Sequence, residues 1–585
     1  MKNFLIVLIL LVAGVAGVYF WANDSAQKIA IQELSKAEEA IKSELGEDIR
    51  ITYDFKDFGL FSKILNIENL SVKNSSSEIK IPKLSILIDG DTFSIDILEK
   101  SKIVEIGTTR TIAEIASISI NNISIEKMRG SKKINDLQST LYFINNLKFE
   151  SVDLLKAKIY NQDRMVPTLE ISQLSLNNIN SGILGNIVLK GFILNGNDQK
   201  INLVDANINN LNITKLKDFA SDIKTMEVNP EIGEVDGLLV FNKFVKSIEF
   251  ENLEVNKAMI RKPISGIIPA KISHLSIGTM NSGILKNTLM QGLVIQDGQI
   301  VSLNSAKIDK FDLGGMYSGL YILSPYATEI DKEGAFDSLM NSFDLGSIEV
   351  NGINVKDPDS YDDIDINSIN FKVGRKDKIV NLVEMELLGF EVDKSKVAMG
   401  LGVPGALESI KEDKIKLDLG INFNIDFNTG EGIIDFSLGI DRIGKFNMEI
   451  VQGGYSESFY YNISNNLEGV LSNPDKLYEQ TTFKSMKYSF SNDGLLEIIK
   501  KEANLSVAQI DQILSQEIGN LEGILSNDLR QRSKKALITF IKSGKGIEIS
   551  LKSKDKDGIS QDKINQLLSF SIPFDKYVEL DIKGE

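Results

Sequence analysis

The stretch Ile67-Glu68-Asn69-Leu70-Ser71-Val72 holds the pattern that decides the fold: an apolar residue, a spacer, an Asn or Gly, and two apolar residues one position apart. A strand with one buried face needs strict alternation, so two successive spacers require a bulge or tight bend that absorbs one residue. Asn and Gly tolerate the backbone angles of such a bulge. The pattern recurs around Asn122, Gly191, Asn210, Asn252, Gly292, Gly352 and Gly389. We therefore predict an extended, repetitive β protein.

A longer repeat carries this short pattern. Residues 147–159 match residues 248–260 at a constant offset of 101 positions, and the sequence Ser-Gly-Ile-Leu at 181–184 recurs at 282–285. The offset between the two copies then changes by one residue in a predicted turn, where a hairpin can differ in length without disturbing its strands. A third copy begins at Ser347 and fades after about Phe371, and a degenerate copy opens the series near Asn69.

These repeats predict a mainly β fold, an extended antiparallel sheet or curved groove with an N-terminal transmembrane helix and a C-terminal α+β cap. A chain of 585 residues exceeds the size at which one compact core keeps growing, which favours an array whose units bury a face on their neighbours. The expected parts are a transmembrane anchor at 1–22, a helical stalk at 23–48, a first β unit at 49–135, β repeats at 136–236 and 237–345, a partial repeat at 346–400, and a long hairpin with an α+β domain at 401–585.

The N-terminus predicts a membrane anchor. Residues 4–21 form an uncharged run of 18 residues that follows Lys2 and ends in three aromatic residues, which favour the membrane interface. With Lys2 inside, nearly everything after Ala22 is exported. A cleaved signal peptide, with a poor small-residue site at 14–16, is the competing interpretation. The next stretch, 25–45, has near-helical apolar spacing and is either a stalk or interfacial helix, or a helix that lies on the first β unit.

The C-terminal third has its own pattern. Residues 415–427 alternate between apolar and polar without a break, which predicts one long strand, and a turn at 428–432 leads into a partner strand. Ser506 and Gln509 form a plausible capping box that opens a helix. We expect further elements, namely helices near 215–226, 331–343, 529–541 and 564–568, and strands near 547–551 and 578–582. This C-terminal α+β region would cover the end of the repeat array and protect its last strand from pairing with other chains.

The sequence offers few candidate catalytic or metal-binding residues. The formal net charge of −16 argues against nucleic acid as a partner, and the absence of cysteine excludes disulfides and thiolate metal sites. His274 is the only histidine, and alternation places it on a polar strand face where Gln173 stands in the preceding repeat. We find no catalytic, cofactor-binding or metal-binding set of residues, so the sequence predicts that the protein is not an enzyme and carries no cofactor.

Two clusters of acidic residues are candidate cation sites. Asp357, Asp359, Asp362, Asp363 and Asp365 could hold a hard cation such as calcium, although surface turns are often rich in Asp for local hydrogen bonding. The run from Asp555 to Gly558 resembles part of a calcium loop but has Ser553 at the first ligand position and Ile564 where the bidentate Glu is required. We interpret it as a hairpin turn.

The anchor, the exported body and the repeated strand pattern together resemble the AsmA-like family of inner-membrane-anchored periplasmic proteins, which is related to the bridge-like lipid-transfer proteins. The resemblance covers residues 1–400 and implies a curved β sheet with an apolar inner face, a single-pass inner-membrane location with most of the chain in the periplasm, and a role in lipid transport and envelope maintenance. The chain departs from the family in its modest length and its C-terminal part. Candidate partners are the inner membrane, phospholipid and envelope proteins.

An apolar face too long to be covered by a few helices must close on itself, pair with another sheet, or present a groove. Acyl chains would fit such a groove. Its candidate lining residues are Leu189, Phe192, Leu194, Met290, Leu293, Ile295, Leu417, Ile421 and Phe423. The same residues could instead form a dry core. Two alternatives to lipid handling therefore stay open: a non-enzymatic structural or interaction scaffold of the cell envelope, and an enzyme with a metal site at residues 357–365.

Overall fold

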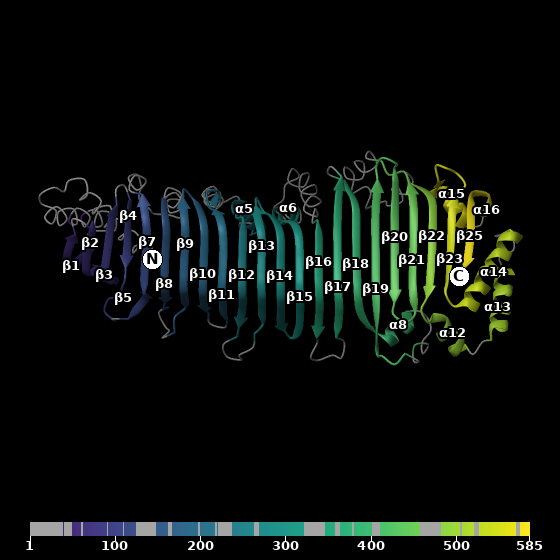
Figure 1. Cartoon of the computed structure of the whole chain (residues 1–585), viewed down its shortest axis with the longest axis horizontal. Helices are drawn as coiled ribbons and strands as arrows, with labels where there is room; N and C mark the ends of the chain where they lie inside the picture. Colours follow the sequence, from purple (N-terminus) through teal and green to yellow (C-terminus); the bar gives the residue numbers. More distant parts are fainter. Residues whose placement is uncertain are drawn as a thin grey trace, which may run out of the picture. The chain divides into compact units, whose positions relative to one another are not determined.

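The computed structural model describes residues 49–124, 148–216, 237–320, 346–456 and 481–585, apart from short gaps inside these ranges, together with Ser35, Glu39 and Phe219. The described residues form two compact units. The N-terminal unit comprises Met1–Asp297 and Lys310–Phe343, and the C-terminal unit comprises Gly298–Asp309 and Asp344–Glu585. Both are mainly antiparallel β structure, which confirms the mainly β, antiparallel part of the predicted fold class (Figure 1). The predicted N-terminal transmembrane helix lies outside the described residues.

The N-terminal unit is an antiparallel sheet in which most strands pair with their sequence neighbours, the exceptions lying between β3 and β8. Its strands are β1 (Arg50–Gly59), β2 (Ile64–Lys73), β3 (Ser77–Asp89), β4 (Thr92–Ile97), β5 (Ser101–Glu105), β6 (Thr111–Ile115), β7 (Ser117–Ser124), β8 (Lys148–Ile159), β9 (Leu169–Asn180), β10 (Ile183–Asn195), β11 (Lys200–Asn212), β12 (Asn252–Arg261), β13 (Ala270–Asn281) and β14 (Ile284–Asp297). Strands β4 and β5 pair with the two halves of β3, and β6 and β7 both pair with β8, so each pair acts as one interrupted strand.

Left-handed residues occur where the short sequence pattern predicts bulges. Asn69, Asn122, Gly191, Asn210, Gly292, Gly352 and Gly389 all have φ between 50° and 64°. The eighth predicted position was wrong, because Asn252 does not have positive φ; the left-handed residue of β12 is Lys257, with φ 52°. Lys156 occupies the corresponding position in β8, with φ 48°. The sequence pattern did not predict these two left-handed positions, because lysine, with its long, unbranched side chain, does not indicate a left-handed backbone.

The 101-residue repeat is visible in the turn geometry. Ser181 and Gly182 connect β9 to β10 with φ of 53° and 83°, and Ser282 and Gly283 connect β13 to β14 with φ of 50° and 84°. Two successive residues with positive φ make the type I′ turn, whose twist matches that of the flanking strands. The predicted one-residue slip falls where a turn was expected, between β10 and β11 in one copy and directly after β14 in the next.

The first strands of the N-terminal unit enclose a dry core. Sixteen residues of this cluster are buried, and Ile67, Leu84, Ile86, Ile95 and Ile97 are fully inaccessible. They come from β1–β4 and β7 and from Ile49, which directly precedes β1. The apolar face is therefore a closed core in this part of the chain.

The C-terminal unit continues the antiparallel order. Its strands are β15 (Gln299–Asp312), of which residues up to Asp309 belong to this unit, β16 (Ser347–Lys356), β17 (Ile364–Lys376), β18 (Ile379–Asp393), β19 (Lys414–Asp426), β20 (Glu431–Ile440), β21 (Gly444–Gly453), β22 (Thr482–Asn492), β23 (Gly546–Ser553), β24 (Ile559–Ser560) and β25 (Val578–Gly584). The predicted long strand is β19, and β20 is its predicted partner. The last strand, β25, pairs with β23.

Helices lie between strands and at the C-terminal end. They are α5 (Gly237–Ser247), α6 (Leu313–Leu320), α8 (Lys394–Gly400), α12 (Leu495–Ala503), α13 (Val507–Gly519), α14 (Asn527–Ser543), α15 (Gln561–Leu568) and α16 (Phe574–Tyr577). The capping box is confirmed, because the Ser506 backbone N–H donates to Gln509 Oε1 over 2.8 Å and the Gln509 N–H donates to Ser506 Oγ over 3.3 Å. The sequence did not predict α5, α6, α8, α12 or α16.

Several predictions fall outside the described residues. They are the anchor at 4–21, nearly all of the stalk at 25–45, most of the helix at 215–226, and the helix at 331–343. Within the described part of the chain, no helix combines the length and the apolar composition that crossing a bilayer requires.

Candidate functional site

An unbroken row of apolar side chains crosses nine strands of the C-terminal unit. Antiparallel register places these residues directly opposite one another, in the order Ile348, Phe371, Met385, Ile421, Phe436, Met448, Tyr488, Ile549 and Ile582. At a strand spacing of about 4.8 Å, the row is about 38 Å wide. A neighbouring row runs from Val350 through Leu387, Leu419 and Leu438 to Phe490. The alternation written in the sequence therefore produces one wide apolar face.

This face is open along its middle. No residue of the Ile348–Ile582 row is buried, and Met385 and Ile421 remain 36% and 38% exposed. A second layer over the sheet would bury such side chains almost completely. Among the described residues no such layer exists, and the side chains of the row remain partly accessible there.

Helices close two margins of the same face. Near one end of β19 and β20, residues of α8 and α12 pack with strand residues into a buried cluster that includes Val397, Ile415, Ile440 and Ile498. At the C-terminal end, Phe540 of α14 makes an edge contact with Phe490, with ring centroids 6.0 Å apart. These helices leave the central strands uncovered.

The N-terminal unit carries an equivalent face between β8 and β14. Leu154, Leu174, Leu189, Ala206, Val255, Leu275 and Met290 lie opposite one another in order. None of them is buried. Helices α5 and α6 pack at one margin, where Val245, Phe250 and Met280 form a small buried cluster.

The structure places all nine candidate lining residues on these apolar faces. Leu189, Phe192, Leu194, Met290, Leu293 and Ile295 share the face of the N-terminal unit, because the positive φ of Gly191 and Gly292 interrupts the alternation while the strand register on either side stays continuous. Leu194 and Ile295 are 37% and 41% exposed. Ile421 and Phe423 lie on the open part of the C-terminal face, whereas Leu417 borders the cluster beneath α8 and α12.

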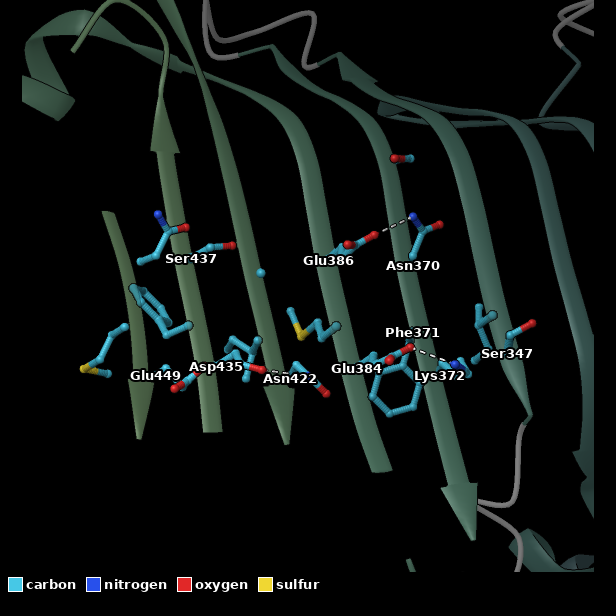
Figure 2. Close-up of a pocket in the computed structure, with 18 of the residues that line it drawn as sticks. Ser347, Asn370, Phe371, Lys372, Glu384, Glu386, Asn422, Asp435, Ser437 and Glu449 are labelled. Carbon is cyan, nitrogen blue, oxygen red and sulfur yellow. Dashed lines mark hydrogen bonds and ion pairs between the residues drawn. The ribbon is translucent and has the colours of Figure 1, made fainter. Parts of the chain in front are cut away.

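The opposite face of the C-terminal unit is polar, and a groove of about 960 Å³ lies over the same strands. Polar residues make up most of its lining, which also includes six members of the apolar row: Ile348, Phe371, Met385, Ile421, Phe436 and Met448. Figure 2 shows its side chains on adjacent strands from β16 to β21. Several residues of the groove are small: Gly420 has no side chain, Ser437 lies directly opposite it, and Ser368 and Ser489 also line the groove. This groove could not be predicted from the sequence, because it depends on small residues of four strands that only the sheet register brings together.

The groove is acidic. Its lining includes five carboxylates and two lysines. Lys372 pairs with Glu384 over 3.0 Å, and the Asn422 amide donates to Asp435 over 3.0 Å. Glu449 stands directly opposite Asp435, an arrangement of like charges that costs stability in an antiparallel sheet. Such a surface disfavours anionic lipid headgroups, which separates the two faces chemically.

Tyr488 places a hydroxyl in the apolar row. Burial raises the pKa of the Tyr488 hydroxyl above its ordinary value. Its ring lies 6.2 Å from Phe446, which in turn lies 4.4 Å from Phe490. The hydroxyl has no hydrogen-bond partner among the described residues, so it is the one polar group in this row that a bound molecule could meet.

Among the described residues, those considered for catalysis do not assemble into a site. His274 lies on the polar strand face as predicted, opposite Gln291, with its Nδ1 atom 2.8 Å from Asn256 Oδ1. Asp357, Asp359 and Asp362 fall outside the described residues, while Asp365 accepts from Asn354. Within the described part, no three His, Cys, Asp or Glu residues come together as a metal site.

The predicted turn near Asp555 is confirmed. It connects β23 to β24, with Gly558 at φ 90°, and the Asp557 N–H donates to Asp555 Oδ1 over 3.1 Å. The Asp555 carboxylate therefore serves the turn itself, as expected for a surface turn.

Comparison with known proteins assigns the chain to no family. No protein-family model matches the chain, and no curated protein matches it.

Proposed function

We propose that this protein is a membrane-anchored, periplasmic lipid-handling protein of the cell envelope that holds acyl chains on its apolar sheet faces. The observation that carries the proposal is the nine-strand apolar row, in which no residue is buried and Met385 and Ile421 are exposed. An apolar surface of this size is rare on a soluble monomer unless it binds something. The resemblance to AsmA-like proteins in the anchor and the repeated strand pattern supports the same function and location.

The energetics suit a carrier without catalytic groups. Burying each methylene contributes about 0.8 kcal/mol, so an acyl chain lying across several of these side chains is held by apolar contact alone. Because the contacts are not directional, the chain can shift from one row to the next without breaking specific bonds. A face of Ile, Leu, Met and Phe therefore suits holding and sliding of lipids.

Lipid content and a pair of matched variants test the proposal. Native mass spectrometry of the gently extracted protein should detect phospholipid, and delipidated protein should rebind a labelled fatty acid. Ile421→Glu together with Met385→Glu should strongly reduce that binding, because both side chains are exposed on the apolar face. Asn424→Glu places a charge in the same strand but on the polar face, and should leave binding unchanged. A protein that neither co-purifies with lipid nor rebinds acyl chains would overturn the proposal.

One observation favours the scaffold alternative. The polar groove of β16–β22 offers carboxylates, amides and hydroxyls over about 960 Å³, which suits a hydrophilic partner of the envelope. A protein partner that saturates this groove, combined with an apolar face that carries no lipid, would support a non-enzymatic interaction scaffold instead.

A further inference from the structure

The end of the apolar face carries an unusual charge pattern. Residues 530–545 contain six basic residues and no acidic residue, in a chain whose formal net charge is −16. Most of this segment is helix α14, which ends at Gly544, where φ is 72°. A positive surface in a strongly acidic protein points to an anionic partner, because the rest of the molecule repels one.

One side of α14 is fixed against the sheet. Leu529, Ser533, Ala536 and Ile541 are buried, and Phe540 lies against Phe490 in the apolar face. Gly584 of β25 has to be glycine here, because a Cβ atom would overlap the Ala536 carbonyl. The helix therefore lies directly on the last strand of the apolar face.

The other side of α14 presents the charge. Lys535 and Lys542 are seven residues apart and so share one face of the helix, and Lys545 follows directly after the helix ends. All three are exposed, and none forms an ion pair with a described residue. By contrast, Arg532 pairs with Asp528 over 3.0 Å, and Lys534 lies 3.7 Å from Asp511. Three lysines thus remain available to a partner.

We infer that the outer side of α14, formed by Lys535, Lys542 and Lys545, docks on an anionic lipid surface. The inference rests on the proposed function in one respect: a protein that carries acyl chains needs its apolar face next to a membrane, and α14 lies at the end of that face. Each lysine close to an anionic surface strengthens binding by about fivefold, so three together contribute roughly 100-fold.

Binding to vesicles tests the inference with the full chain. The protein is held in phosphatidylcholine nanodiscs, which occupy its apolar N-terminal segment, and is then floated with vesicles of phosphatidylcholine alone or mixed with phosphatidylglycerol. Only the anionic vesicles should bind, and binding should fall steeply with salt, since the screening length shrinks from about 10 Å at 0.1 M to about 3 Å at 1 M. Equal binding to both vesicle types would overturn the inference.

A matched pair of triple variants locates the surface. Lys535→Gln, Lys542→Gln and Lys545→Gln together should weaken binding to anionic vesicles roughly 100-fold. The control, Lys190→Gln, Lys271→Gln and Lys286→Gln, removes the same charge from exposed positions of the N-terminal unit and should bind like the unchanged protein. Equal loss in both, or no loss in the first, would contradict the assignment to α14.

Two further measurements distinguish loss of vesicle docking from unfolding and from loss of bound lipid. A melting curve shows that each variant remains folded, as expected for exposed lysines without ion pairs. Lipid co-purification with the α14 variant should be unchanged, because the apolar face is intact. Loss of vesicle binding with retained lipid supports docking, whereas retained vesicle binding and absent lipid would remove the proposed function and leave docking standing. Capture of an acidic protein without any vesicle binding would show that the partner is not a membrane.

Discussion

The side chain of Ser273 occupies the space that a side chain on Gly292 would need. Gly292 stands where the sequence pattern predicts a bulge in β14 and has φ 61°, and Ser273 Oγ lies closer to its missing Cβ than real Cβ atoms tolerate. The same relationship joins Ser172 to Gly191, one repeat earlier. Bulge and neighbouring serine are therefore copied together, so that Leu293 and Ile295 return to the apolar face.

Replacing Gly292 with Ala should destabilise the N-terminal unit by more than the cost of left-handed backbone alone, which is about 1–2 kcal/mol. Gly107→Ala is the control, because Gly107 has φ 90° with no atom near its missing Cβ. Chemical denaturation should show a larger loss for Gly292→Ala, and adding Ser273→Gly should restore part of it. Equal losses at both glycines would contradict the steric account.

Truncation of leucines should separate the closed core from the open face. Leu84 is fully buried in the first strands, so Leu84→Ala should cost about 2–5 kcal/mol of unfolding free energy. Leu194 is 37% exposed on the face between β8 and β14, so Leu194→Ala should cost less than about 1 kcal/mol. Similar losses, measured by denaturant titration, would mean that the face is covered in solution.

The Tyr488 hydroxyl should lose its proton at a higher pH than an ordinary tyrosine does. Burial raises the pKa of its hydroxyl above the ordinary value, so the folded state favours the protonated form. The associated stability is complete below the unfolded pKa of about 10 and is lost as pH rises through the folded pKa. Ultraviolet titration of tyrosinate should lose its latest component in Tyr488→Phe. Unchanged titration in this variant would refute the assignment.

Ser347 should contribute to the acid stability of the C-terminal unit. Its hydroxyl donates to Asp309, and this hydrogen bond, followed by the charge of Lys307, holds the pKa of the Asp309 carboxyl below its usual value. The stability is present above the unfolded pKa of about 3.9 and is lost as pH falls through the lower folded pKa.

Ser347→Ala should therefore reduce stability at neutral pH by less than about 1 kcal/mol, since Asp309 is substantially exposed. The difference between variant and unchanged protein should vanish at strongly acidic pH. A difference that persists there would show that the serine acts through packing instead. Unfolding midpoints measured across acidic pH provide the comparison.

The sequence predicted the strand order well because the governing interactions are local. Alternation in residues 415–427 defines β19, and the Ser-Gly dipeptides at 181–182 and 282–283 define two hairpins. The capping box of Ser506 and Gln509 was also predictable from spacing alone. Helices α5, α6 and α8 were missed, because each is short and its helical pattern is broken by glycine or merges with the neighbouring strand pattern.

By itself, the sequence determined that this is a repetitive antiparallel sheet with one apolar side, since the period of two and the Asn or Gly bulges fix which face each side chain takes. Only the tertiary structure decided where that side is closed, as around Leu84, and where it is open, as around Ile421. Exposure depends on which distant elements cover a strand, and the strands of the two regions carry similar apolar residues. The same holds for the cationic side of α14, whose position over Phe490 depends on contacts made fifty residues away along the chain.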